Sequence, residues 1–279
     1  IKKTVMRAVT DSLGEIVFDR DRPGVYNLLI IFEALTGWNR EQIEAHFSGK
    51  GYGDLKKGVA DKNVRVIIIS GEGSTFSSGH DLKELKLARK NPDKGKKFFK
   101  KILDKCSAMM QLIINSPKPV IAEVGGIATA AGCQLVASCD LAYANNLAKF
   151  ATPGVNIGLF CSTPMVALSR TLSNKHSMEM LLSGELISSD KAEKVGLINK
   201  VLKETELKKF TNEIALKISK KSGMTLKMGK EAFYNQITMN LSDAYNYASK
   251  VMLENMLKLD AKEGIDAFLE KRSPKWQDK

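Results

Sequence analysis

The sequence has few of the residues that build disulfide frameworks or metal centres. Its four cysteines, Cys106, Cys133, Cys139 and Cys161, show no CxxC spacing, and its three histidines are scattered along the chain. Free thiols in a reducing compartment, mitochondrial or cytoplasmic, are therefore expected rather than disulfides, and no set of metal ligands is visible. We expect neither a metal nor a resident cofactor.

Long hydrophobic runs are also absent. No segment approaches the ~18 consecutive apolar residues that a membrane-spanning helix needs, so we expect a soluble protein with no membrane partner. The chain starts at Ile1 rather than Met, as expected of a fragment or a processed product. Its first five residues are too short for the apolar core of a signal peptide, and a removed targeting sequence stays open.

Aromatic residues are scarce and acidic residues are outnumbered. Aromatics make up 7% of the chain, whereas its net charge is +12. The basic excess is densest in residues 83–105, which hold ten basic and three acidic residues. This excess favours an anionic ligand, such as a phosphate-rich molecule or nucleic acid, or else a solvated lysine-rich helix face. Few aromatics interleave with the lysines, which argues against base stacking on nucleic acid.

What the sequence does contain is a long alternation of apolar runs and segments with helical spacing. A chain of 279 residues that is 43% hydrophobic can bury a sizeable core. Repeated strand–turn–helix units indicate an α/β core, followed by a helical C-terminal part. We expect strands at residues 64–70, 120–124, 141–144 and 149–151, helices at 82–88, 95–115 and 132–138, and mostly helix from 164 to 268.

Two turns rich in small residues follow apolar strands and lead into helical segments. They are FSSGHDL at residues 76–82 and AAGCQ at residues 130–134. Such a turn at a helix start leaves backbone N–H groups unpaired near the positive end of the helix dipole. If the two turns face one another, they can hold a developing oxyanion between two N–H donors. No carboxylate stands beside the second turn.

From about residue 64 onward the chain resembles the enoyl-CoA hydratase/isomerase (crotonase) superfamily. The resemblance spans roughly 215 residues and implies a spiral of repeated ββα units, assembled as trimers or hexamers, with acyl-CoA thioesters as ligands. We therefore expect a crotonase-like α/β core over residues 62–200 and a helical trimerisation-type part over 201–279. The matching motifs are VIIISG (66–71), FSSGHDL (76–82), PKPVIA (117–122), GCQL (132–135), CDLA (139–142), FATP (150–153), SGE (183–185) and FLEKRSPKW (268–276).

The resemblance implies an oxyanion hole made of the backbone N–H groups of His80 and Ala131. His80 is also open to a different role, as a base for another reaction or in packing or helix capping. Cys161 is expected to line the acyl pocket rather than to act as a nucleophile, because no basic neighbour is visible. The remaining substrate-binding candidates are Ser78, Gly79, Asp81, Leu82, Lys83, Gly132 and Phe160, with Lys86, Lys271 and Arg272 as contacts for the phosphates of coenzyme A.

The chain departs from the family at the acid–base positions. The two glutamates of hydratases fall on Gln134 and Gly154. Glutamine can orient a water but cannot take up a proton near neutral pH, and glycine supplies no side chain. We therefore expect acyl-CoA binding, as part of lipid or fatty acid metabolism, with weak or absent hydration. Restoring glutamate at both positions should raise hydration if the geometry of the site survives.

Residues from about 3 to 61 do not resemble a crotonase front end. Instead, MRAVTDS (6–12), RPGVYNLL (22–29) and GKGYGDLK (49–56) resemble the stretch after the KMSKS loop of tryptophanyl-tRNA synthetase. The nucleotide-binding motifs of that enzyme are absent, so this mostly helical segment cannot activate tryptophan. A fusion (a chimera), a composite chain without its own activity and a tRNA-associated module all stay open.

Overall fold

The computed structural model describes residues 15–19, 25, 29, 39–48 and 64–279. The chain forms two compact units, Ile1–Ile67 and Ile68–Lys279. In the first unit, α3 (Arg40–Phe47) is a helix within the segment that was expected to be mostly helical. It begins with a capping box, in which the Asn39 side chain accepts the Gln42 N–H at 2.9 Å. The rest of the synthetase-like segment lies almost entirely outside the described residues.

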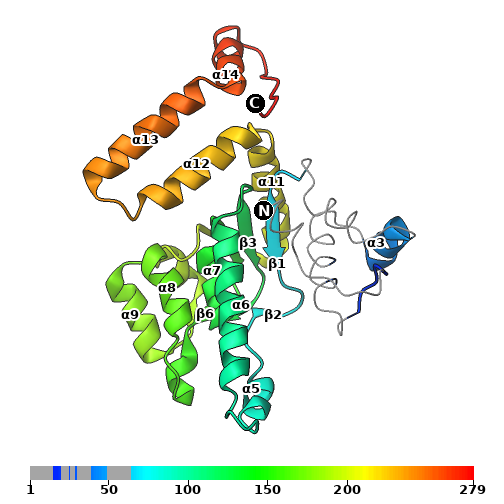
Figure 1. The fold of residues 1–279 in the computed structure, drawn as a ribbon, viewed down its shortest axis with the longest axis vertical. Helices are drawn as coiled ribbons and strands as arrows, with labels where there is room; N and C mark the ends of the chain where they lie inside the picture. The colour runs from blue at the N-terminus through cyan, green and yellow to red at the C-terminus, as the bar shows by residue number, and fades with distance from the viewer. Residues whose placement is uncertain (1–14, 20–24, 26–28, 30–38, 49–63) are drawn as a thin grey trace. The chain divides into compact units, whose positions relative to one another are not determined.

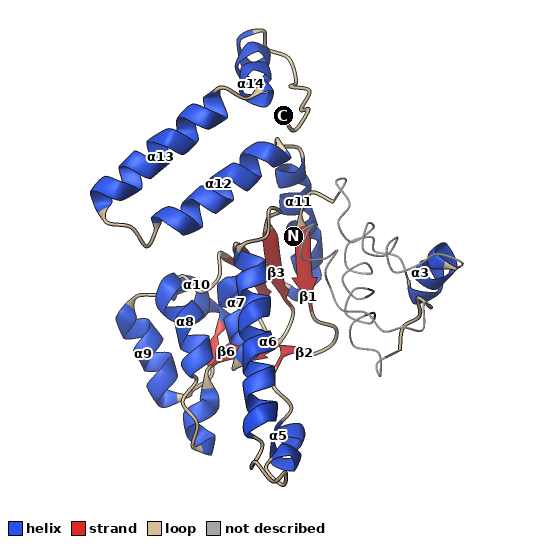
Figure 2. Cartoon of the chain, in the orientation of Figure 1, coloured by secondary structure: helices blue, strands red, loops and turns tan. Residues whose placement is uncertain are grey.

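From Ile67 onward the chain alternates between strands and helices (Figure 2). The strands are β1 (Ile67–Ser70), β2 (Thr75–Ser77), β3 (Val120–Val124), β4 (Ile127–Thr129), β5 (Leu141–Asn145), β6 (Lys149–Ala151), β7 (Ile187–Ser188) and β8 (Lys200–Leu202). The helices are α5 (Leu82–Ala88), α6 (Lys96–Ile114), α7 (Ala131–Ser138), the short 3-10 helix η1 (Pro153–Ile157), α8 (Ser162–Thr171), α9 (Asn174–Ser183), α10 (Ser189–Val195), α11 (Glu204–Ser219), α12 (Gly223–Gln236), α13 (Leu241–Met256) and α14 (Leu259–Leu269).

Successive strands enter two different sheets. One sheet has the order β1-β3-β5-β8 and the other the order β2-β4-β6-β7. The pairings β3–β5, β5–β8, β2–β4 and β4–β6 are parallel, while β6 and β7 are antiparallel. The pairs β1–β2, β3–β4 and β5–β6 thus each contribute one strand to each sheet before a helical segment, whereas α10 separates β7 from β8. This arrangement confirms the crotonase-like spiral of ββα units with a helical C-terminal part.

The longer elements follow directly from the sequence. Strand β3 lies between two neighbours, and Val120, Ile121, Ala122 and Val124 are all buried, as expected of a strand covered on both faces. Helix α6 (Figure 1) covers nearly the whole segment expected to be helical, and it ends just before a turn that contains two prolines. The buried side chains of α6 fall on one face, toward α7.

Four short strands, β2, β4, β7 and β8, were not expected from the sequence. Strands β2 and β4 each have three residues, too few for an alternating pattern; β4 ends directly before the second turn, and β2 includes the first two residues of the first turn. The turns therefore follow these short strands, not the longer apolar strands as expected. Strands β7 and β8 likewise interrupt the segment that was expected to be mostly helical beyond residue 164.

A buried ion pair attaches α12 to the core. The Lys230 ammonium donates to Asp140 Oδ2 at 2.6 Å and to the carbonyls of Ile113 at 2.9 Å and Lys118 at 3.2 Å. The Tyr234 hydroxyl donates to the second Asp140 oxygen at 2.9 Å. Helix α13 lies alongside α12, and α11 packs on β3 and β5 (Figure 1). The boundary predicted at residue 200 stays a prediction.

Candidate functional site

The two small-residue turns lie against each other, which is the condition that the sequence left open. A Cβ placed on Gly79 would lie 3.1 Å from both Ala131 N and Ala130 Cβ. On the second turn, a Cβ on Gly132 would overlap the carbonyl oxygen of Ser77. The parallel pairing of β2 with β4 explains this contact, because it brings the ends of both strands to the same edge of their sheet.

Two backbone donors point out of these turns. Among the described residues, neither the His80 N–H nor the Ala131 N–H has a hydrogen-bond acceptor in the protein. Ala131 is the first residue of α7, where no intrahelical acceptor is available. Both residues are partly exposed, so a ligand oxygen can reach them. Unpaired backbone N–H donors on neighbouring turns are the type of group that stabilises an oxyanion.

The residues after the first turn begin α5. The Asp81 carboxylate accepts the Lys83 N–H at 2.7 Å and thereby caps the helix. The capping role considered for His80 therefore belongs to its neighbour. Leu82, Lys83 and Lys86 are exposed on the first turns of α5, and Ser78 accepts a hydrogen bond from Thr129 through its carbonyl at 3.4 Å.

The side chain of Gln134 accepts a hydrogen bond from the thiol of Cys106, a contact that the sequence did not predict. Gln134 is 4% exposed, and its Oε1 accepts a hydrogen bond from Cys106 Sγ on α6 at 3.8 Å. Its amide oxygen therefore faces the interior. No cysteine spacing signals this contact, because it depends on how α6 packs against α7.

Gly154 has no room for a side chain. A Cβ at this position would lie 2.8 Å from Cys161 Sγ and 2.8 Å from the Leu159 carbonyl oxygen. One of these neighbours is main chain, held in place by the Leu159 N–H bond to the Gly154 carbonyl at 2.9 Å. A glutamate side chain cannot be accommodated at position 154 unless the loop moves. The condition set for restoring hydration, a site geometry that survives the substitution, is therefore not met in this structure.

The thiols beside the site are protonated at neutral pH. Burial raises the pKa of Cys161, although a hydrogen bond from the Gly154 backbone partly offsets the effect. Burial raises the pKa of Cys133 to about 12. A neutral thiol is a poor nucleophile, so the structure offers no support for covalent chemistry at Cys161. Phe160, next to it, is 42% exposed.

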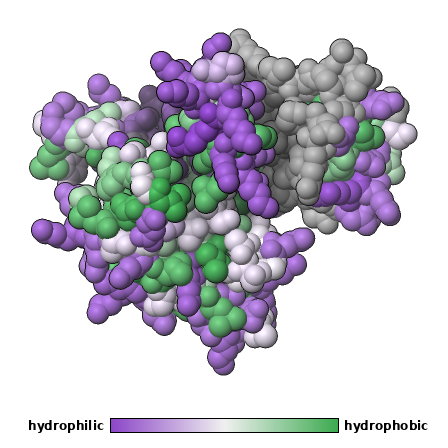
Figure 3. Space-filling model, turned by 90° about the horizontal axis from the view of Figure 1, so that it is seen from below, coloured by the Kyte–Doolittle hydropathy of each residue, from purple (hydrophilic) through white to green (hydrophobic). Residues whose placement is uncertain are grey.

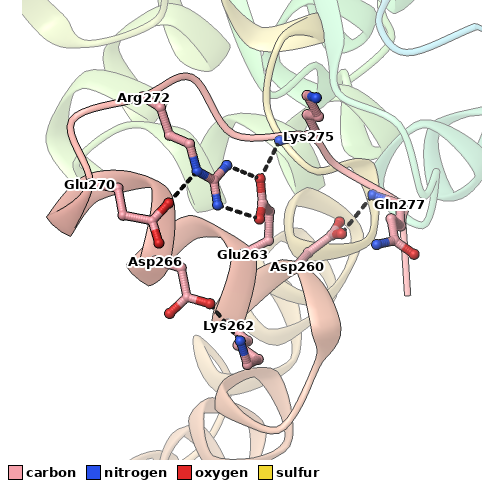
Figure 4. Close-up of polar contacts among 8 residues, drawn as sticks. All are labelled: Asp260, Lys262, Glu263, Asp266, Glu270, Arg272, Lys275 and Gln277. Carbon is pink, nitrogen blue, oxygen red and sulfur yellow. Dashed lines mark hydrogen bonds and ion pairs between the residues drawn. The ribbon is translucent and has the colours of Figure 1, made fainter.

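The two C-terminal cations predicted to meet phosphates differ in their surroundings, and Figure 4 shows those of Arg272. The Arg272 guanidinium donates to both Glu263 oxygens, at 2.7 and 3.0 Å, and to Glu270 at 2.5 Å. Arg272 lowers the pKa of Glu263 to about 2. Lys271 is exposed and makes no ion pair with any described residue. The charge of Arg272 is therefore neutralised by two carboxylates, whereas that of Lys271 is not neutralised by any described residue.

The lysine-rich segment is on the surface. Nearly all basic residues between Lys83 and Lys105 are exposed, and Figure 3 shows hydrophilic side chains gathered beside apolar areas on one face. In the part of the chain that the structure describes, no group of three or more histidines, cysteines or carboxylates is arranged to hold a metal ion. Within the same residues, no helix combines the length and apolar character needed to span a bilayer.

A groove of about 560 Å³ lies elsewhere, among the C-terminal helices. Its lining comes from the start of α12, the end of α13, α14 and the tail, and includes Leu226, Ile265, Phe268 and Trp276. None of the residues of the two turns contributes to it. The groove is therefore separate from the site formed by the oxyanion donors.

Comparison with known proteins gives consistent matches over most of the chain. The enoyl-CoA hydratase/isomerase family model matches residues 53–279, starting before the boundary predicted at residue 62. The Xenopus laevis enoyl-CoA hydratase domain-containing protein 3, mitochondrial, is 50% identical over 223 residues, covering 80% of this chain and 74% of the relative. The human protein of that name is 50% identical over 218 residues, with 78% and 70% covered.

Solved structures agree with the sequence matches. The Mycobacterium smegmatis enoyl-CoA hydratase superposes with a TM-score of 0.74 at 40% identity and covers 89% of this chain and 87% of its own. The human enoyl-CoA hydratase domain-containing protein 3 gives a TM-score of 0.73 at 48% identity, with 79% and 87% covered. None of these four proteins is a tRNA synthetase, so the resemblance predicted for residues 3–61 is without support.

Proposed function

The chain belongs to the enoyl-CoA hydratase/isomerase family, and from this we propose that it binds an acyl-CoA thioester whose carbonyl oxygen lies between the N–H groups of His80 and Ala131. The observation that carries the proposal is the contact of the two turns, in which neither donor has an acceptor among the residues that the structure describes. Two preorganised N–H groups in a partly buried site favour an oxygen that gains negative charge.

We propose further that hydration is weak or absent. A hydratase needs one group to activate water and another to deliver a proton, and each such group is worth ~10²–10⁴-fold in rate. Here Gln134 cannot exchange a proton, and Gly154 has no side chain and no space for one. The remaining function is acyl-CoA binding, with at most weak thioester or isomerase chemistry in lipid metabolism.

The phosphates of coenzyme A need cations near the entrance of the site. Lys83 and Lys86 follow the first turn on α5, and Lys271, unlike Arg272, makes no ion pair with a carboxylate among the described residues. These three side chains are our candidates for phosphate contacts. Screening by salt weakens such exposed contacts, so affinity for coenzyme A should fall as ionic strength rises.

We also propose a homotrimer in the mitochondrion. The Xenopus laevis and human sequence relatives carry the word mitochondrial in their names. The C-terminal helices expose large apolar side chains: Leu241 is 75% exposed, Leu257 78% and Phe268 83%. Exposed apolar groups at this density are typical of interaction sites between proteins. Sedimentation equilibrium tests the assembly.

The test of the proposed function measures binding and turnover on one preparation. Calorimetric titration with crotonyl-CoA should give saturable binding, while loss of the crotonyl absorbance in the same buffer should stay near the uncatalysed rate. Hydration at a rate typical of enzymes would overturn the proposal, and so would failure to bind crotonyl-CoA. Salt-dependent tRNA binding centred on residues 1–60 would support the alternative of an RNA-associated module, and the absence of any tRNA shift at low salt would dispose of it.

A further inference from the structure

The turn between α5 and α6, together with the first half of α6, carries a group of exposed cations that the proposed function does not use. Figure 1 shows α5 and the start of α6 at the opposite end of the second unit from α14. Six exposed lysines here make no ion pair with any described residue: Lys90, Lys94, Lys96, Lys97, Lys101 and Lys105. We call these six side chains, together with Leu87, the α5–α6 surface.

The few carboxylates of the segment do not neutralise this surface. Residues 83–105 hold ten basic and three acidic residues. Of the three, Asp93 accepts two backbone N–H groups at the start of α6, at 3.0 and 3.1 Å, and Asp104 pairs with Lys100 at 2.6 Å. A strong positive charge therefore remains on the exposed side, where it attracts an anionic partner.

Exposed leucines accompany the cations. On α5, Ala88 is buried and Leu85 is half-buried, so their side of the helix faces the protein. Leu82 and Leu87 are 56% and 64% exposed. Two exposed leucines beside lysines on a helix of seven residues are more than a solvated charged face needs. Cations next to exposed aliphatic groups are typical of helices that lie on a membrane surface.

The aromatic residues of the segment are already engaged, which argues against RNA as the partner. Phe98 and Phe99 are half-buried and pack edge to face, with 6.2 Å between their ring centres. The Arg89 guanidinium lies 5.5 Å from the centre of the Phe99 ring. Binding of single-stranded RNA uses open aromatic faces on which bases stack. Phospholipids offer phosphates and hydrocarbon together, and they match lysine and leucine better.

We propose that the α5–α6 surface docks on a membrane that contains anionic phospholipids. The lysines contact lipid phosphates, and Leu87 enters the boundary between headgroups and acyl chains. A peripheral contact of this kind needs no membrane-spanning helix. It is therefore separate from the expectation of no membrane partner, which came from the lack of long apolar runs. The docking also does not depend on the acyl-CoA site.

The test is co-sedimentation of the full chain with vesicles of phosphatidylcholine, with or without a minor fraction of phosphatidylglycerol. We expect binding only to the anionic vesicles, weakening as salt rises. Lys90→Gln, Lys96→Gln, Lys97→Gln and Lys101→Gln combined should weaken binding more than about tenfold, since one lysine near an anionic membrane contributes roughly fivefold. Leu87→Gln alone should weaken it roughly three- to tenfold, because less apolar surface is buried.

The matched controls lie on α11, away from this surface. Leu216→Gln changes a leucine that is 61% exposed. A second variant makes the same change of charge at four exposed lysines: Lys203→Gln, Lys208→Gln, Lys209→Gln and Lys217→Gln. Neither control should alter binding to the vesicles.

Three results would overturn the proposal. The first is a wild-type protein that does not bind anionic vesicles. The second is an equal loss in the two lysine variants, or unchanged binding by Leu87→Gln, because net charge alone would then account for the attraction. The third is tighter binding of single-stranded RNA than of vesicles, lost in the α5–α6 lysine variant, which would assign the surface to nucleic acid.

Discussion

At Gly154, the packing of neighbouring atoms leaves no space for a side chain. Cys161 Sγ and the Leu159 carbonyl occupy the space into which a side chain at Gly154 would project. Side chains forced into filled space typically lower the free energy of unfolding by ~1–3 kcal/mol. A glutamate at position 154 would therefore clash with its neighbours, so a single substitution does not restore the carboxylate.

We predict that Gln134→Glu combined with Gly154→Glu lowers the free energy of unfolding and does not restore hydration. Urea denaturation and a crotonyl-CoA hydration assay measure the two effects. Gly229→Glu is the matched control, because a Cβ at Gly229 on α12 meets no atom within 4 Å. Rapid hydration by the double variant would show that the loop can open to admit a carboxylate.

Lys271 has a positive φ, which is a strained backbone conformation for a residue other than glycine. It follows the last residues of α14 with φ at 55°, while Arg272 N–H bonds to the Ala267 carbonyl and Lys271 N–H to the Phe268 carbonyl. This is the Schellman arrangement, in which the position of Lys271 is usually glycine. A lysine kept there at an energetic cost is consistent with a role for its ammonium group.

Lys271→Gly should therefore stabilise the protein and weaken its binding of coenzyme A. We expect the free energy of unfolding to rise by about 1 kcal/mol as the positive φ is relieved, and the affinity for coenzyme A to fall at low salt. Thermal denaturation and calorimetric titration give the two values. Unchanged affinity at low salt would remove Lys271 from the candidate phosphate contacts.

At the scale of elements, the ion pair between Lys230 and Asp140 determines how α12 is attached. The two side chains are 8% and 17% exposed, and the lysine also satisfies two carbonyls at the end of α6 and before β3. Burial lowers the pKa of Lys230, whereas Asp140 acts in the opposite direction. A charge left here without its partner would be buried and uncompensated.

Lys230→Met should accordingly destabilise the second unit strongly. Breaking a buried ion pair costs about 3–5 kcal/mol, which chemical denaturation can measure. Lys262→Met breaks an exposed pair with Asp266 on α14 and should change stability little. Similar losses in both variants would contradict the view that burial makes the Lys230 pair important.

The same elements show which parts of the fold the sequence can predict. Strand β3 and helix α6 were predicted closely because an apolar run, a helical period and two prolines define them locally. Strands β2 and β4 have three residues each and exist because neighbouring strands pair with them, which no local pattern records.

The site divides in the same way. Small residues before helical segments predicted the two turns, whereas their contact with one another is seen only in the structure. The contact of Cys106 with Gln134, the filled space beside Gly154 and the positive φ of Ala130, at 51°, could not be predicted. The contact of Cys106 arises where α6 meets α7, and the conformation of Ala130 depends on β6. The space beside Gly154 depends on how its own loop folds back, so none of the three leaves a signal in residue type or spacing.

At the scale of the whole second unit, the tail after α14 links helices that are far apart in sequence. Asp260 accepts the N–H groups of Gln277 and Asp278 at 2.7 and 3.0 Å, and Trp276 donates to the Lys220 carbonyl at 2.7 Å. Glu263 joins the same network through Arg272 and the Lys275 N–H (Figure 4). The tail thus connects α14 with the junction of α11 and α12.

This network predicts how the unit responds to acid. Because the pKa of Glu263 falls from its ordinary value of 4.5 to about 2 in the folded protein, its contribution to stability is complete above pH 4.5. It is lost as the pH falls toward 2. Glu263→Gln should lessen the decline in urea stability over this range, whereas Glu254→Gln, an exposed carboxylate of α13 without an ion pair among the described residues, should not.

The central claim is that this molecule polarises a thioester without hydrating it. The most direct measurement is the infrared difference spectrum of isotope-labelled crotonyl-CoA bound to the protein, because the carbonyl frequency reports hydrogen bonding to its oxygen. We predict a carbonyl band at lower frequency than in free crotonyl-CoA, stable while the spectrum is recorded. An unshifted band, or its replacement by that of the 3-hydroxyacyl product, would contradict the account.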